Sequence, residues 1–86
     1  MKTVLLAYER EQDLNAMEVL LKARGHTVLR AKNGVDALEQ VRREGPSVVV
    51  SDVLLPKLDG FALCRRIKDD PLVQHIAPPR PYVGNR

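Results

Sequence analysis

The sequence predicts an α/β fold in which helices cover both faces of a parallel sheet. Two observations support this prediction. Short runs of strand-forming residues alternate with longer segments whose apolar residues recur at helical spacing. The order is strand, helix, strand, helix, strand, helix, and each helical segment is long enough to connect two parallel strands by a right-handed crossover. A chain of 86 residues forms one domain with a thin core.

The first strand is predicted over residues 3–7 and the first helix over residues 11–24. Residues 3–7 are apolar without alternation, which is typical of a strand buried on both faces of a parallel sheet. Gly25 lies where a helix commonly ends in glycine. The apolar stripe of this helix is Leu14, Met17, Leu20 and Leu21.

Two further strands follow, with a helix between them. Residues 26–31 alternate in part, as a strand at a sheet edge does, and residues 35–44 form a helix that ends at Gly45. The apolar stripe of this helix is Ala37, Leu38 and Val41. Residues 47–51 give the strongest strand signal, because three consecutive valines come just before Asp52.

The third helix and a proline-rich segment complete the pattern. The apolar stripe of this helix is Phe61, Cys64 and Ile67. The helix ends near Pro71. Residues 77–86 contain three closely spaced prolines, which cannot donate hydrogen bonds to a sheet. We therefore expect a folded unit over residues 1–76 and an extended, largely unstructured tail over residues 77–86.

Composition excludes several classes of protein. The formal net charge is +3, but Arg80 and Arg86 lie in residues 77–86, which hold no acid, so residues 1–76 carry 14 − 2 = 12 bases against 11 acids. This balance does not indicate nucleic-acid binding. Cys64 is the only cysteine, which excludes an intramolecular disulfide and favours the cytoplasm. The first apolar run is too short for a signal peptide or a membrane span.

Two acids follow strands at the end of the sheet where ligands of open α/β folds bind. Glu9 comes after the first strand and Asp52 ends the third. If these strands are neighbours, the two carboxylates face each other and suit a hard cation such as Mg²⁺. A carboxylate beside Mg²⁺ can also act as a nucleophile and carry an aspartyl phosphate. The alternative is that both acids merely cap loops and helices.

Residues 51–61 read Ser-Asp-Val-Leu-Leu-Pro-Lys-Leu-Asp-Gly-Phe and resemble the phosphorylation loop of bacterial response-regulator receiver domains. Residues 32–38 and 64–71 resemble the parts of the family that enter its second helix and form its third. The likeness implies the flavodoxin-like fold of the family, a doubly wound parallel sheet, here with three strands in the order 2-1-3. It also implies Asp52 as phosphoacceptor, a histidine kinase or phosphotransfer protein as donor, and the backbone carbonyl of Leu54 as a third Mg²⁺ contact beside Glu9 and Asp52.

The sequence departs from the family in two ways. The family usually has two consecutive acids after its first strand, where this chain has Tyr8 and Glu9. The family also has a fourth strand with a switch hydroxyl and a fifth with a lysine at its end, and we expect this chain to be truncated after the third helix. We therefore expect a receiver-type signalling module, not an enzyme, with impaired phosphorelay.

Two rival functions stay open at this stage. One is a pseudo-receiver, which has the fold but acts as a protein–protein interaction module without phosphate. The other is a small Mg²⁺-dependent phosphotransfer enzyme or phosphatase with Asp52 as nucleophile, although the chain offers no general acid beyond Glu9.

Other residues allow two interpretations or suggest a surface. Tyr8 either lies over the crevice and excludes metal or turns outward to solvent. Lys57 is either solvated or near an anion beside Asp52, and Cys64 is a packed core thiol. In the order 2-1-3 the third strand becomes an edge without lysine or proline to protect it, which predicts a homodimer or higher oligomer through that edge.

Overall fold

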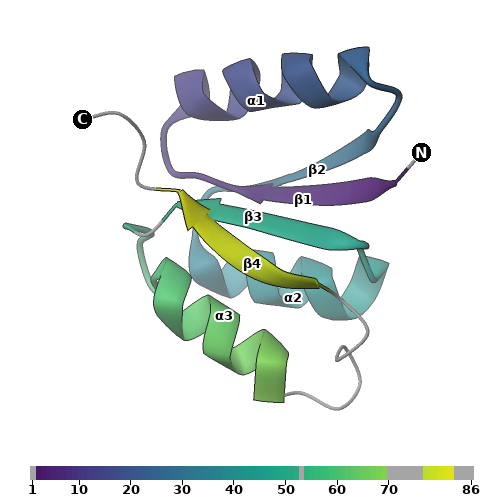
Figure 1. Ribbon diagram of the computed structural model, residues 1–86. Helices are drawn as coiled ribbons and strands as arrows, with labels where there is room; N and C mark the ends of the chain where they lie inside the picture. Colours follow the sequence, from purple (N-terminus) through teal and green to yellow (C-terminus); the bar gives the residue numbers. More distant parts are fainter. Residues whose placement is uncertain (1, 53, 70–76, 83–86) are drawn as a thin grey trace.

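The computed structural model describes residues 2–52, 54–69 and 77–82. Figure 1 shows the elements of these residues and their order along the chain. The elements are β1 (Thr3–Ala7), α1 (Glu11–Ala23), β2 (Thr27–Ala31), α2 (Gly34–Glu44), β3 (Val48–Asp52), α3 (Gly60–Asp69) and β4 (Ala77–Tyr82). The predicted order of the first six is confirmed. The bounds of β1 are those predicted, and the bounds of the next four elements differ by one residue at one or both ends.

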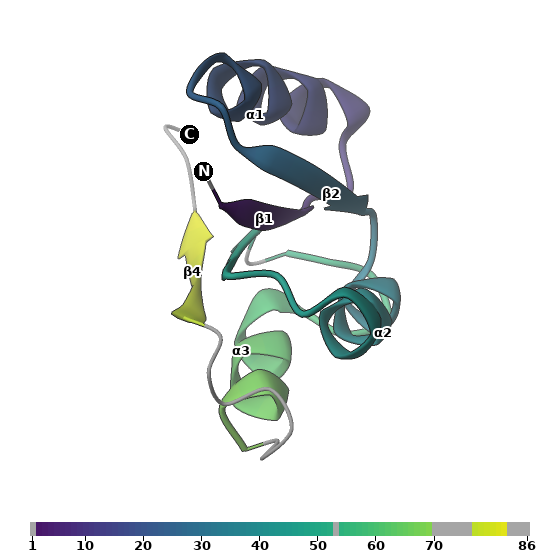
Figure 2. The ribbon, with the colours of Figure 1, turned by 90° about the vertical axis from the view of Figure 1, so that its right-hand side faces the viewer.

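The strands form one parallel sheet in the order β2-β1-β3-β4. α1 covers one face, and α2 and α3 cover the other (Figures 1 and 2). This arrangement confirms the doubly wound fold and the order 2-1-3 of the first three strands. No helix in the part of the chain described here is long and apolar enough to cross a membrane.

β4 corrects the prediction of a largely unstructured tail, at least for residues 77–82. Val48 pairs with Ala77 and Val50 pairs with Arg80, so the two residues Pro78 and Pro79 lie opposite the single residue between the valines. Such a bulge interrupts the hydrogen bonds between β3 and β4 at the place where proline has no N–H to donate. β4 also lies at the edge of the sheet, where a strand tolerates proline. The rest of the predicted tail lies outside the described residues.

β3 is consequently an inner strand, and the prediction that it forms an unprotected edge is wrong. It pairs with β1 on one side and with β4 on the other. Val49, in the middle of β3, is fully buried. While β4 is paired with β3, the β3 edge is therefore not free to join a second copy, as the predicted homo-oligomer requires.

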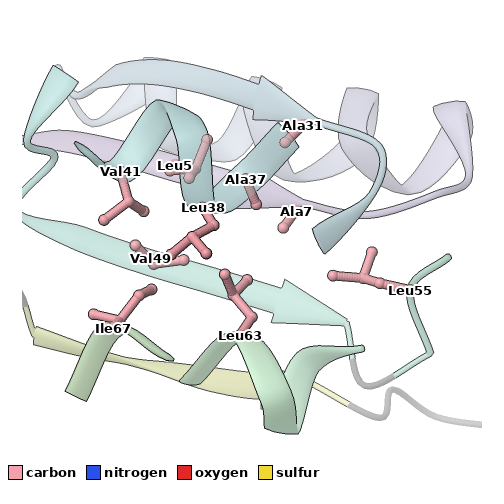
Figure 3. Close-up of a cluster of buried hydrophobic side chains, with 10 residues drawn as sticks. All are labelled: Leu5, Ala7, Ala31, Ala37, Leu38, Val41, Val49, Leu55, Leu63 and Ile67. Carbon is pink, nitrogen blue, oxygen red and sulfur yellow. The ribbon is translucent and has the colours of Figure 1, made fainter. Parts of the chain in front are cut away.

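β1 is buried on both faces, as its continuous apolar run predicts. Leu5 and Ala7 point toward α2 and α3, whereas Val4 and Leu6 point toward α1. Figure 3 shows the larger cluster, in which side chains from the sheet meet those of the two helices. This cluster consists of Leu5, Ala7, Ala31, Ala37, Leu38, Val41, Val49, Leu55, Leu63 and Ile67.

The apolar stripes of the helices were predicted with mixed success. The stripe of α2 is buried throughout. Leu20 on α1 is 55% exposed and Phe61 on α3 is 64% exposed, which contradicts the prediction for both. The residue that α3 buries in its place is Leu63, which shares a face with Ile67 because residues four apart lie on the same side of a helix. Cys64 lies beside this stripe and is only half-buried.

Ion pairs attach α1 to β2. Glu11, in the first turn of α1, accepts from Arg30 on β2 and from Lys32, whose Nζ lies 2.7 Å from its carboxylate. Glu18, two turns later, lies 3.5 Å from Nε of Arg30 and 2.7 Å from Nζ of Lys22. The hydrogen bonds from Lys32 and Arg30 lower the pKa of Glu11, and the hydrogen bond from Lys22 lowers that of Glu18.

We expect these pairs to make stability depend on pH in the acid range. A carboxyl whose pKa is lower in the folded state stabilises the fold fully above its unfolded value of 4.5, and this contribution is lost as pH falls through the lowered value. The melting temperature should therefore fall on acidification from about pH 7 to about pH 3, and Glu11→Gln should reduce that fall. Glu39→Gln, a change at an exposed glutamate of α2, is the control. An unchanged pH profile in Glu11→Gln would contradict the assignment.

We expect removal of β4 to expose β3 and cause self-association. A chain that ends at residue 76 should have a higher molar mass by light scattering at low micromolar concentration than one that ends at residue 82, because an unpaired inner strand is a template for pairing. The two truncations differ only in β4. Equal masses, with circular dichroism showing both to be folded, would argue against a protective role of β4.

Candidate functional site

The candidate site lies at the carboxyl ends of β1 and β3. Ala7 is in register with Ser51, which places Tyr8 beside Asp52 and Glu9 one residue farther along. The backbone N–H of Tyr8 donates to the carbonyl of Ala31 at 3.0 Å, so the sheet continues one residue beyond β1. The structure thus brings both predicted acids to the same end of adjacent strands.

The two acids have different surroundings. Asp52 is only 8% exposed, whereas Glu9 is exposed. Ser51, next to Asp52, is fully buried, and its hydroxyl donates to the backbone carbonyl of Asp52 at 2.8 Å. Asp52 is therefore held in a fixed backbone position, and Glu9 is the more accessible carboxylate.

The N-termini of the helices use other residues as caps. Asn33 accepts from the N–H of Asp36 at 2.7 Å at the start of α2, and Asp59 accepts from the N–H of Ala62 at 2.8 Å at the start of α3. α1 begins after Arg10 without a side-chain cap. The alternative in which Glu9 and Asp52 serve to cap helices therefore has no support in these contacts.

Tyr8 is buried, which excludes the alternative in which it turns outward to solvent. Its side chain is 2% exposed and belongs to the cluster under α1 with Leu6 and Leu14. Tyr8 directly follows Ala7, the partner of Ser51, and stands where the family usually has an acid.

The β3–α3 loop is anchored to α2. The N–H of Gly34, the first residue of α2, donates to the carbonyl of Pro56 at 3.2 Å, and a Cβ at Gly34 would overlap the carbonyl of Leu58. Leu58 also donates to Pro56 at 2.7 Å across Lys57, whose φ of 70° is left-handed. This tight turn is the strained form of a three-residue turn. Lys57 itself is exposed, as a solvated loop lysine would be.

Two features of this site were not predicted from the sequence. The sequence pattern gives Gly34 no role beyond its place in residues 32–38, and nothing in its neighbours signals the close approach of Leu58. Asp52 is in register with Tyr82 on β4, a pairing that the sequence pattern does not predict. The prolines before Tyr82 concealed this strand in the sequence pattern.

The residues at this site are of the type that binds Mg²⁺, but they are few. The described residues contain no group of three or more His, Cys, Asp or Glu side chains that could hold a metal ion. Two carboxylates and the backbone carbonyl of Leu54 are nevertheless hard oxygen ligands, and Mg²⁺ often binds proteins through only one or two carboxylates. His26 accepts from the backbone N–H of Lys2 at 3.2 Å, and His75 lies outside the described residues.

The sequence matches the family described as response regulator receiver domain over residues 4–77. The chain belongs to this family. The response regulator PleD of Caulobacter vibrioides is 36% identical to the chain over 73 residues, which are 85% of this chain and 16% of PleD. The chain therefore spans only a small part of that relative.

Solved receiver domains have the same fold as this receiver domain. The N-terminal domain of a response regulator receiver protein from Methanoculleus marisnigri superimposes with a TM-score of 0.84 at 25% identity, over 88% of this chain and 62% of that one. The receiver domain of a sensor histidine kinase from Pseudomonas aeruginosa, solved with magnesium in its active-site cleft, gives 0.81 at 23% identity, over 87% and 62%. Phosphoryl acceptance in two-component signalling is the function of this family.

We expect Gly34→Ala to destabilise the domain by about 1 to 3 kcal/mol, because the added methyl overlaps the backbone of the β3–α3 loop. Val35→Ala is the matched control at the exposed neighbouring position of α2 and should change stability by less than about 0.5 kcal/mol. Urea denaturation measures both. If Gly34→Ala were as stable as Val35→Ala, the loop would not be anchored through Gly34.

Proposed function

We propose that this chain is a receiver module in which Asp52 accepts a phosphoryl group from a histidine kinase or a phosphotransfer protein. The observation that carries the proposal is the position of Asp52. It ends β3 at the ligand-binding end of a doubly wound sheet, beside the strand that leads to Glu9, and begins the loop that resembles the family's phosphorylation loop. A cytoplasmic location fits the single cysteine and a histidine kinase or phosphotransfer protein as phosphoryl donor.

The reaction needs only one nucleophilic oxygen from this chain. A carboxylate oxygen of Asp52 would form the new P–O bond, while the bond from phosphorus to the donor nitrogen breaks and its electron pair leaves with the imidazole. No proton has to be taken from Asp52, because the carboxylate attacks in its ionised form. The pairing of β3 and the hydrogen bond from Ser51 would fix the backbone from which this side chain reaches the donor.

Glu9, Asp52 and the backbone carbonyl of Leu54 would hold Mg²⁺. When bound, the ion would neutralise charge on the phosphoryl oxygens. The chain has one acid fewer than the family at this place, because Tyr8 stands where the other acid usually lies. We therefore propose weak Mg²⁺ binding and slow phosphorylation, because each lost electrostatic group costs about 10² to 10³ in rate.

A second candidate function is the pseudo-receiver, in which the same fold binds a partner protein without phosphate. The burial of Tyr8 beside Asp52 favours this alternative, because an apolar ring stands where a metal-binding acid is usual. The phosphatase or phosphotransferase alternative gains nothing from the structure, since Glu9 is the one carboxylate besides Asp52 that the described residues place at this end of β1 and β3.

Phosphorylation can be measured with Mg²⁺ and a small acyl phosphate by intact mass spectrometry. We expect one phosphoryl adduct that accumulates slowly, is absent in Asp52→Asn and forms more slowly in Glu9→Gln. The matched control is Asp69→Asn, an exposed acid at the end of α3, which should behave as the unchanged chain.

The other outcomes distinguish the rival functions. An unmodified chain at saturating donor would favour the pseudo-receiver. Catalytic consumption of the donor without an adduct would favour an enzyme. Rapid, complete phosphorylation that depends on Asp52 would keep the receiver function but show that Tyr8 and the missing acid matter less than proposed.

A further inference from the structure

Tyr8 and Asp52 lie side by side on the same face of the sheet. Side chains alternate along a strand, and Val4, Leu6 and Tyr8 all belong to the cluster under α1. Val50 packs against the same cluster, so Asp52, two residues later on β3, points to that face as well. Neighbouring strands are about 4.8 Å apart, which a tyrosine ring easily spans.

Both side chains are buried although they lie at the end of the sheet. Glu9 and Arg10, the next residues of the chain, are exposed, whereas Tyr8 is 2% and Asp52 8% exposed. The hydrogen bond from the N–H of Tyr8 to Ala31 holds the backbone of Tyr8 in the sheet. The backbone of Tyr8 is therefore fixed one residue beyond β1, from where its buried ring can reach the carboxylate of Asp52 on the next strand.

We propose that Tyr8 is an occluding residue, whose ring limits the access of phosphodonors and cations to Asp52. The proposal rests on Asp52 being the reactive group of the proposed function. It differs from the loss of an acid at this position, because an absent acid weakens metal binding but leaves the carboxylate open. A covering ring instead lowers the reactivity of Asp52 toward any reagent, whether or not a metal takes part.

The test is carboxyl labelling of the folded chain with a water-soluble carbodiimide and an amine, read by peptide mass spectrometry. Glu9 is an internal standard, because it is exposed and close by in the sequence. In the unchanged chain we expect Asp52 to react about tenfold more slowly than Glu9, as a group that needs local opening does. Equal rates would overturn the proposal without any variant.

Two variants separate the ring from the hydroxyl. Tyr8→Leu keeps apolar packing against Leu6 and Leu14 but removes the ring, and it should raise labelling of Asp52 severalfold while labelling of Glu9 stays the same. Tyr8→Phe keeps the ring and should label as the unchanged chain does. Faster labelling of Asp52 in Tyr8→Phe would overturn occlusion by the ring. So would a folded Tyr8→Leu in which Asp52 is labelled no faster than in the unchanged chain.

Folding of each variant is checked by circular dichroism. If Tyr8→Leu does not fold, Tyr8→Met replaces it, since methionine fills irregular space in a core. Labelling needs neither phosphodonor nor Mg²⁺, so its outcome is independent of the phosphorylation test. Asp52 that is protected by Tyr8 but never phosphorylated would refute the proposed function and leave the occlusion intact.

Discussion

The burial of β1 on both faces determines where the other elements can lie. A strand that must hide Val4 and Leu6 on one side and Leu5 and Ala7 on the other needs a helix layer on each face and a strand on each edge. The parallel registers with β2 and β3 meet this requirement, and they also bring the ends of β1 and β3 together. The position of the candidate site therefore follows from the burial of β1 between its two neighbouring strands and two helix layers.

The site and the core are continuous at Tyr8. The same side chain completes the cluster under α1 and stands next to the carboxylate of Asp52. A substitution there changes packing and chemistry together, which is why conservative replacements are needed to separate the two. On the opposite face Gly34 plays a comparable part, because it joins the start of α2 to the loop that follows Asp52.

Most of the fold and the location of the site follow from local patterns in the sequence. The valines of β3, the stripe of α2 and the two strand-end acids all lie where periodicity and topology place them. Leu20 and Phe61 were misplaced because each helix has more apolar residues than its buried face accepts. β4 was missed because its prolines argue against a strand. An edge strand with a bulge tolerates proline, but only the observed pairing shows that β4 has this position.

The two helix layers are attached to the sheet by different forces. α2 and α3 contact the sheet through the larger apolar cluster, whereas α1 combines a smaller apolar cluster with exposed or partly buried ion pairs to β2 through Glu11, Glu18 and Arg30. Dissolved salt screens exposed charges over a distance of about 10 Å at 0.1 M but leaves apolar contact largely intact. Ionic strength therefore acts directly on the contact between α1 and β2, and a saline medium would weaken the attachment of α1 to the sheet.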